Sequence, residues 1–274
     1  MLRILHVSDL HFGTPSVPEQ VEALEGFIER EPLDAIVISG DLSQRTRRHE
    51  FERAGRFVRL CERKAPTLVV PGNHDCAWWA RYAGGNFFSM FSRYRELVRS
   101  DLEPRMQIPG ATIVGLNTAH GIQSYTLTTR PRDLSVVGAV RPRQWEAARI
   151  AFAMAPQGDL KVLVMHHNLL RGNLSNRWGL ASRALGIVDA SLTGADVVCC
   201  GHDHEERIEE VESARRRFVV STAGTMTTRT RGGRPGSWNL IERGEGTLAV
   251  SLYEWVEAQR DFARTRVSKW ARPG

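Results

Sequence analysis

Short apolar runs and longer amphipathic stretches alternate along the first 200 residues of the chain. The apolar runs have the length and composition of buried strands, and we expect strands at residues 2–8, 34–39, 68–70, 111–116, 160–165 and 196–200. The stretches between them favour helices, and we expect these at residues 19–31, 47–63, 87–98, 142–155 and 180–192. Strands that alternate with helices are typical of βαβ units, so a largely parallel sheet is predicted.

The pattern changes after residue 206. Short alternating runs predict antiparallel strands at residues 207–211, 217–221, 238–242 and 247–255. The run 247–255 is suited either to the edge of a dimer or to an internal position in a sheet.

Three other segments lack a strong pattern. Residues 120–141 are expected to be a functional loop or an irregular insertion, and residues 171–179 a shorter loop. The basic stretch 259–274 is expected to be a loosely docked tail.

No repeat or linker divides the chain, which predicts one domain over residues 1–274. Its parts are a motif-bearing region at 1–205, antiparallel strands at 206–258 and the basic tail.

Composition narrows the class of protein. With 274 residues and 42% hydrophobic residues, the chain can fill a large core and is not a disordered segment. The net charge of +6 comes almost entirely from arginine, since the chain has only three lysines. This bias is compatible with an anionic partner, although genome base composition explains it more simply.

The four cysteines form no CxxC pair, which excludes a disulfide framework and a thiolate metal site. No signal peptide or membrane-spanning run is visible, so a cytoplasmic location is expected.

Polar residues of the types that bind metals follow five of the expected strands. These blocks are Ser8-Asp9-Leu10-His11, Gly40-Asp41, Gly72-Asn73-His74-Asp75, His166-His167 and Gly201-His202-Asp203-His204. Ligands gather at the carboxyl ends of strands in open α/β sheets, so we expect one cluster. Carboxylate oxygen together with imidazole nitrogen suits Mn, Fe or Zn.

The cluster offers too many ligands for one ion. Two ions about 3.5 to 4 Å apart, bridged by one carboxylate, would use them all and hold a shared hydroxide. Such a hydroxide suits in-line attack on phosphorus, and a nearby imidazolium can protonate the departing oxygen.

The ordered series DLH, GD, GNHD, HH and GHDH resembles the calcineurin-like metallophosphoesterases, whose pattern is D-x-H, G-D, G-N-H-D/E, H and G-H-x-H. The resemblance covers about three quarters of the chain. It implies a four-layer αββα sandwich of two mixed sheets flanked by helices, with a dinuclear metal site at the carboxyl ends of the strands.

The resemblance also implies a role for each residue. One metal would be held by Asp9, His11 and His204, the other by Asn73, His166 and His202, and Asp41 would bridge them. His74 would contact the phosphate and act as the general acid, and Asp75 would orient it. Of the histidine pair, His166 aligns with the family block, and His167 is expected to support it.

The family resemblance leaves the substrate open. The chain is most similar to bacterial class III cyclic nucleotide phosphodiesterase-like members, which implies a cyclic nucleotide or another small phosphodiester. Candidate substrate contacts are the Trp78-Trp79-Arg81-Tyr82 stretch and the loop at 168–177. The tryptophan pair could stack a base beside arginines or could simply pack a helix start.

Three alternatives remain at this point: a DNA-repair-type metallonuclease, a lipid-precursor pyrophosphatase and, last, an inactive scaffold. Nucleic acid is therefore the second choice of partner, and a homodimer is open. The histidines outside the blocks, His6, His49 and His120, are expected to be structural. Asp203 is expected to be solvated, and Cys76 is given no catalytic role.

Overall fold

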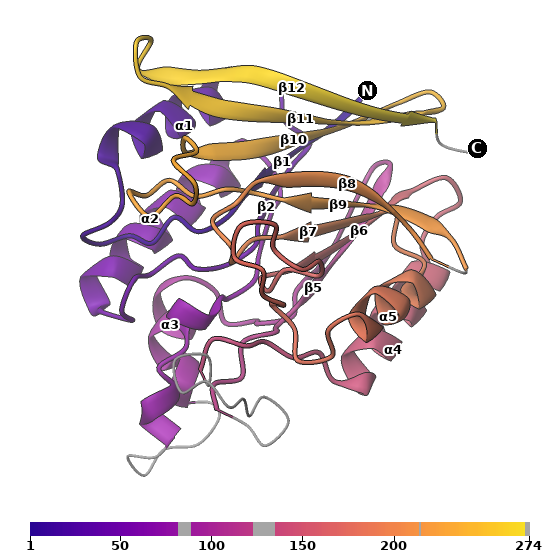
Figure 1. Ribbon diagram of the computed structural model, residues 1–274, viewed down its shortest axis with the longest axis horizontal. Coiled ribbons are helices and arrows are strands. Elements are labelled where there is room, and N and C mark those ends of the chain that lie inside the picture. Colours follow the sequence, from indigo (N-terminus) through magenta and orange to yellow (C-terminus); the bar gives the residue numbers. More distant parts are fainter. Residues whose placement is uncertain (82–88, 123–134, 214, 272–274) are drawn as a thin grey trace.

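The strands of the computed structural model form two six-stranded sheets that pack face to face (Figure 1). The structure describes residues 1–81, 89–122, 135–213 and 215–271. Helices cover both outer faces, which gives four layers. The prediction of a sandwich of two mixed sheets flanked by helices is confirmed.

The first sheet has the order β12-β11-β10-β1-β2-β3. Its strands are β1 (Leu2–Val7), β2 (Ala35–Ile38), β3 (Thr67–Val69), β10 (Ser237–Gly244), β11 (Thr247–Val256) and β12 (Asp261–Ala271). The first three run parallel, as the βαβ pattern predicted, and the last three are added antiparallel.

The second sheet has the order β4-β5-β6-β7-β9-β8. Its strands are β4 (Arg105–Ile108), β5 (Ala111–Leu116), β6 (Leu160–Met165), β7 (Val197–Cys200), β8 (Arg207–Glu212) and β9 (Arg217–Thr222). The central four are parallel and the two edge strands are antiparallel.

The helices pack on the outer faces of the sheets. They are α1 (Pro18–Arg30), α2 (Arg48–Lys64), α3 (Ser92–Leu97), α4 (Pro142–Ala153) and α5 (Leu185–Thr193). Helices α1 and α2 cover the first sheet, and α4 and α5 cover the second (Figure 1). None of the described helices combines the length and the apolar character that a membrane span needs.

Three apolar cores separate the four layers, and β1 shows why. Leu5 and Val7 point into the core under α1 and α2, whereas Ile4 points into the core between the sheets. A strand buried on both faces reads as a continuous apolar run, which is why the sequence identified it.

The structure corrects three expectations, decides one alternative that was open and adds one strand. The basic stretch is not a loose tail, since β12 pairs with β11 along its length. The run 247–255 is therefore internal rather than a dimer edge. Strand β4 was not expected, and β9 pairs parallel to β7 rather than antiparallel. Helix α5 begins at Leu185, five residues later than expected. Of the predicted loop at 120–141, residues 123–134 lie outside the described part.

Candidate metal centre

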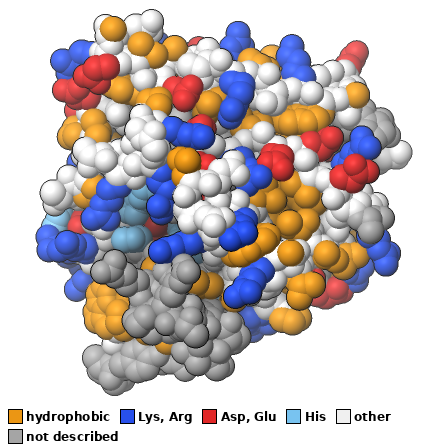
Figure 2. Space-filling model, in the orientation of Figure 1, with side chains coloured by type: hydrophobic (Ala, Val, Ile, Leu, Met, Phe, Trp, Pro, Cys, Tyr) orange, Lys and Arg blue, Asp and Glu red, His pale blue; other side chains and the backbone are white. Residues whose placement is uncertain are grey.

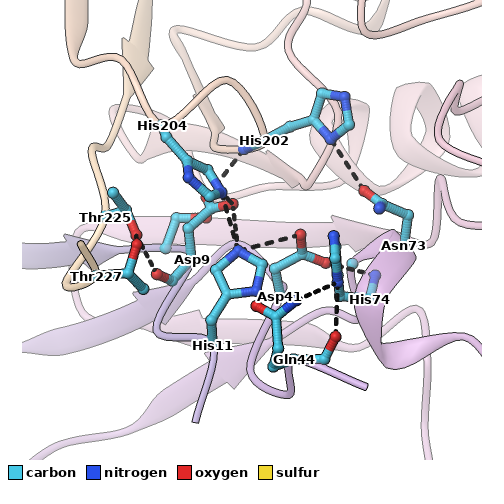
Figure 3. A network of polar contacts seen from close by, with 12 residues as sticks. Asp9, His11, Asp41, Gln44, Asn73, His74, His202, His204, Thr225 and Thr227 are labelled. Atoms are coloured by element: carbon cyan, nitrogen blue, oxygen red, sulfur yellow. Dashed lines mark hydrogen bonds and ion pairs between the residues drawn. The ribbon is translucent and has the colours of Figure 1, made fainter. Parts of the chain in front are cut away.

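The seven predicted ligands converge at the carboxyl ends of five strands. Figure 3 shows all of them except His166 with labels. Strand β1 leads to Asp9 and His11, β2 to Asp41, and β3 to Asn73 in a short 3-10 turn. Strand β6 leads to His166, and β7 to His202 and His204. The ligands therefore come from both sheets, which meet at this edge of the sandwich.

Five of these ligands have a left-handed backbone conformation. Their φ values are 54° at Asp9, 42° at His11, 52° at Asp41, 76° at His202 and 53° at His204. Such angles are uncommon for residues other than glycine and concentrate at functional sites, where the surrounding structure enforces them. The turns after β1, β2 and β7 thus direct side chains inward at a conformational cost.

Glycines leave room for these side chains. A Cβ atom on Gly72 would lie 2.1 Å from Oδ1 of Asp41, and one on Gly201 would lie 2.3 Å from Oδ2 of Asp9. Both distances are far below van der Waals contact, so the carboxylates occupy the space that any larger residue would need.

The first group of ligands surrounds Asp9. Its Oδ1 atom lies 3.2 Å from Nε2 of His204 and 3.6 Å from Nε2 of His11, and these two nitrogens are 2.9 Å apart. The Nδ1–H group of His204 donates to the carbonyl of Arg229 at 2.9 Å. That bond leaves Nε2 of His204 free to bind on the inner side.

The second group surrounds Asn73. Its Oδ1 atom lies 2.9 Å from Nδ1 of His202 and 3.1 Å from Nε2 of His166. The Nδ1–H group of His166 donates to the carbonyl of Ser39 at 2.8 Å, which again directs Nε2 inward.

Asp41 joins the two groups. Its Oδ2 atom lies 3.6 Å from Nε2 of His11 in the first group and 3.3 Å from Nε2 of His166 in the second. Its Oδ1 atom accepts the backbone N–H of His74 at 2.8 Å. One oxygen of the Asp41 carboxylate is therefore held by a hydrogen bond, and the other lies between the two groups of ligands.

These residues fit a pair of metal ions. Donors bound at about 2.1 Å to one ion lie roughly 3 to 3.4 Å from each other, close to the spacings within each group. Oδ1 of Asp9 is buried and accepts no hydrogen bond from any residue that the structure describes. Carboxylate, amide oxygen and imidazole are also donors that first-row transition metals accept.

The electrostatics of the cluster favour cations. Burial raises the pKa of the Asp9 and Asp41 carboxyls, but the neighbouring imidazoles outweigh burial and hold both pKa values well below their usual range. Burial lowers the pKa of His166, but the Asp41 carboxylate overcomes this and raises it to about 9. Two buried carboxylates thus remain charged and attract positive charge to the space between the groups.

His74 lies beside this cluster, and one of its ring nitrogens already forms a hydrogen bond. Its Nδ1–H group donates to the carbonyl of Gln44 at 2.8 Å (Figure 3). Nε2 is therefore the nitrogen that remains for a ligand. This tautomer is the one required to pass a proton through Nε2.

The structure differs from the expected pairing of Asp75 with His74. The Asp75 carboxylate accepts backbone N–H groups of Leu42, Ser43 and Gly72 at 3.1, 2.7 and 2.9 Å. It ties together the loops after β2 and β3, and Gln44 provides the partner of the imidazole. Burial and the nearby Asp41 raise the pKa of Asp75 to about 6.

Both nitrogens of His167 already have partners, namely Thr118 Oγ1 at 2.7 Å and the carbonyl of Val136 at 2.8 Å. Burial and the imidazoles of His202 and His166 lower its pKa, so the ring is neutral.

Two further expectations meet different outcomes. Asp203 is buried rather than solvated, and it accepts a hydrogen bond from Asn168 at 2.7 Å. Cys76 is buried, and burial raises its pKa to about 12, so it is not a reactive thiolate.

Three residues of the site were not predicted. Ser39, Gln44 and Arg229 each bind a histidine through a backbone carbonyl. A carbonyl is common to every residue type, so no sequence signal could have identified them.

The tryptophan pair divides into two roles. Trp78 is partly buried and packs against the first core, whereas Trp79 is 47% exposed. The side chain of Arg81 and residue Tyr82, also predicted as substrate contacts, lie outside the described part of the chain.

Comparisons with known proteins give a family match and one partial relative. A family model described as calcineurin-like phosphoesterase matches residues 2–206. A putative phosphoesterase, 078R of Invertebrate iridescent virus 3, is 31% identical over 78 residues, which are 26% of this chain and 22% of the viral protein.

Solved structures share the fold at low identity. The purple acid phosphatase PPD1 of yellow lupin has a TM-score of 0.69 and 10% identity, over 99% of this chain and 54% of that one. GAP50 of Plasmodium, an anchor in the inner membrane complex, has a TM-score of 0.60 and 11% identity, over 100% and 89%. The chain thus spans about half of the lupin enzyme and under a quarter of the viral relative.

Proposed function

Because the chain belongs to the calcineurin-like phosphoesterases, we propose that it hydrolyses phosphodiesters with two transition-metal ions, Mn, Fe or Zn. Asp9, His11 and His204 would hold one ion, Asn73, His166 and His202 the other, and Asp41 both. The observation that carries this proposal is the position of Asp41 Oδ2, within 3.6 Å of a histidine nitrogen from each group.

Two such ions, when bound, supply Lewis acidity and lower the pKa of a water molecule to near neutrality. The protein's own part is to place the proton donor. As the bond between phosphorus and the leaving oxygen breaks, His74 gives that oxygen the proton on Nε2. The Gln44 carbonyl keeps the other ring proton on Nδ1, so the ring leaves the step neutral and correctly oriented.

Asp41 couples the proton donor to the metal centre. One of its oxygens is shared between the ligand groups, and the other accepts the backbone N–H of His74 at 2.8 Å. Asp75 supports the same arrangement by binding the loops that carry Asp41 and His74. The Asp41 carboxylate therefore contacts both ligand groups and also positions the backbone of the proton donor His74.

We propose a cyclic nucleotide or another small phosphodiester as the substrate. Two arginines, Arg45 and Arg47, and the exposed Trp79 line the same cavity as His74, and they suit a phosphate and a base. A metallonuclease, a lipid-precursor pyrophosphatase and an inactive scaffold are the alternatives. The complete ligand set counts against the scaffold, since six of the seven ligands are buried or have a left-handed backbone, which is costly unless it serves a site.

The test is hydrolysis of bis(p-nitrophenyl) phosphate, compared with p-nitrophenyl phosphate, by protein whose metal content has been measured. We expect about two transition ions per chain and faster turnover of the diester. A strong preference for the monoester would reject the diesterase, and full activity in protein freed of metal would reject the mechanism. Single-stranded DNA and a lipid pyrophosphate, assayed in parallel, distinguish the alternatives.

We also propose a cytoplasmic location and a homodimer. The four cysteines are free and buried, which suits a reducing compartment. Helices α4 and α5 are adjacent, and Met154, directly after α4, and Leu185, the first residue of α5, are exposed, which suits a contact between copies. Cell fractionation tests the first proposal and light scattering after size exclusion the second.

A further inference from the structure

A cavity of about 460 Å³ opens directly beside His74. Its lining includes Asn73 and His74 from the site and Arg45, Arg47 and Trp79 from the neighbouring segments. In Figure 2, histidine side chains lie in a hollow bordered by basic side chains. Its volume lies in the range of small-molecule sites.

Hydrogen bonds from other parts of the chain hold the backbone of the loop at residues 45–47, which lines the cavity. Glu50, which is buried, accepts the backbone N–H groups of Arg45 at 2.8 Å and Arg47 at 3.1 Å. Arg93 donates to the carbonyl of Thr46 at 2.7 Å, and Thr46 has a left-handed φ of 54°. The backbone is therefore prepared before any ligand arrives.

The two arginines of this loop differ from Arg48, the next arginine along the chain. Among the residues that the structure describes, neither Arg45 nor Arg47 forms an ion pair, whereas Arg48 pairs with Glu52 and with Glu96. Guanidinium groups match phosphate oxygens in a bidentate geometry. Two uncompensated guanidinium groups beside a phosphoesterase centre thus form a site for a second anion.

Trp79 lines the same cavity with an indole that the core does not use. Its ring meets that of Trp78 edge to face, with centroids 5.9 Å apart, and Trp78 is anchored in the first core. An exposed aromatic ring held by a buried neighbour offers a surface for stacking a base.

We propose that this cavity binds the leaving group of the substrate and that the leaving group is a nucleotide. Its base stacks on Trp79, and its own phosphate binds Arg45 and Arg47. The assignment rests on the proposed function, because the group attached to the leaving oxygen must lie where His74 can protonate that oxygen. It deepens the proposal by naming the substrate class.

This assignment favours linear dinucleotides over cyclic mononucleotides. In the dinucleotide pApA, cleavage of the bond between the central phosphorus and the 3′ oxygen releases AMP, whose 5′ phosphate is the second anion. Water supplies the hydroxyl added to phosphorus, and the 3′ oxygen takes the proton from His74. The products are two molecules of AMP. A cyclic mononucleotide has only the phosphate that reacts.

The test compares kcat/KM for pApA and for ApA, which lacks the terminal phosphate, in the metal-loaded protein. We expect pApA to be preferred by about 10- to 100-fold, the size of charged hydrogen bonds. Replacing Arg45 and Arg47 together by Gln should bring the ratio close to 1. Arg48→Gln is the matched control and should keep the ratio, since Arg48 does not line the cavity.

Trp79→Ala should lower kcat/KM for both dinucleotides by about 5- to 100-fold, and Trp79→Phe should restore most of it. A ratio near 1 in the unaltered protein, or a preference that survives the double substitution, would overturn the inference. Absence of bis(p-nitrophenyl) phosphate hydrolysis by the unaltered protein would instead reject the proposed function. Melting temperatures confirm that the variants fold.

Discussion

Two groups of buried polar side chains lie at different depths in the same sandwich. The interior group is centred on His6, within β1. Its Nδ1 lies 3.0 Å from Ser221 Oγ and its Nε2 lies 3.0 Å from Ser39 Oγ. Both ring nitrogens are satisfied by uncharged hydroxyls, and the residue has ordinary strand geometry.

The strand-end group has the opposite properties. Two imidazole nitrogens, of His11 and His204, face each other at 2.9 Å, and Asp9 Oδ1 accepts no hydrogen bond within the described part of the chain. Five of its members have strained backbones. Buried polar groups are normally satisfied, so the unsatisfied group is the one prepared for a ligand. Burial and residue type alone would not have distinguished the strand-end group from the interior group, since both contain buried histidines.

The change expected to have the largest effect is Asp41→Asn, which removes the shared charge but keeps the side chain's shape. We expect loss of bound metal and a fall in kcat/KM of at least about 10⁴-fold, because several kcal/mol of metal catalysis disappear. Metal analysis and kinetics on the same sample measure both. Asp101→Asn, at an exposed carboxylate, should change neither. Retention of both ions in Asp41→Asn would show that Asp41 is not shared.

His74→Ala should keep the metal and lower kcat by about 10²- to 10⁴-fold, the usual contribution of a proton donor. The loss should be larger for dinucleotides than for bis(p-nitrophenyl) phosphate, because nitrophenolate leaves without a proton. Kinetics on both substrates measure the difference, and His49→Ala, at an exposed histidine, is the control. Equal losses on the two substrates would contradict the role of general acid.

Removal of metal should destabilise the protein, since ions bind only the folded strand-end group. At 100 times Kd, bound ligand contributes about 2.7 kcal/mol, or about 5 to 10 °C in Tm for a chain of this size. Calorimetry with and without chelator measures the shift. An unchanged Tm would mean that the cluster is satisfied without ions.

For the interior group, we expect the free energy of unfolding to depend on pH rather than on metal. Burial lowers the pKa of His6 to about 3. The ring is therefore neutral in the folded protein, whereas it is protonated below about pH 6.5 when unfolded. The contribution of the neutral His6 ring to the free energy of unfolding is complete above pH 6.5. It is lost as the pH falls toward 3, by up to about 1.4 kcal/mol per pH unit.

His6→Gln should reduce this pH dependence, measured by urea unfolding between pH 7 and 4 with chelator present throughout. His49→Gln should retain the slope of the original protein. Identical slopes for the original protein and His6→Gln would remove His6 as the source.

The sequence alone was sufficient to predict which polar side chains lie together at the strand ends. Asp9, Asp41 and His202 each follow an apolar run that is buried on both faces, so both the strand and its end could be recognised. It was insufficient where backbone atoms act, as at Gln44, whose carbonyl binds His74.

Edge strands were also difficult to predict. In β12, Arg264 and Arg266 are exposed, and only residues such as Phe262 pack inward. The basic residues therefore concealed a strand that is defined by its pairing with β11. Strand β4, also at an edge, carries polar residues for the same reason.

The central claim is that the strand-end group binds two ions through one shared carboxylate. Anomalous diffraction from crystals grown with Mn²⁺ tests it most directly. We expect two peaks about 3.5 to 4 Å apart, one among Asp9, His11 and His204, the other among Asn73, His166 and His202, with Asp41 contacting both. A single peak, or two peaks without contact to Asp41, would contradict the account.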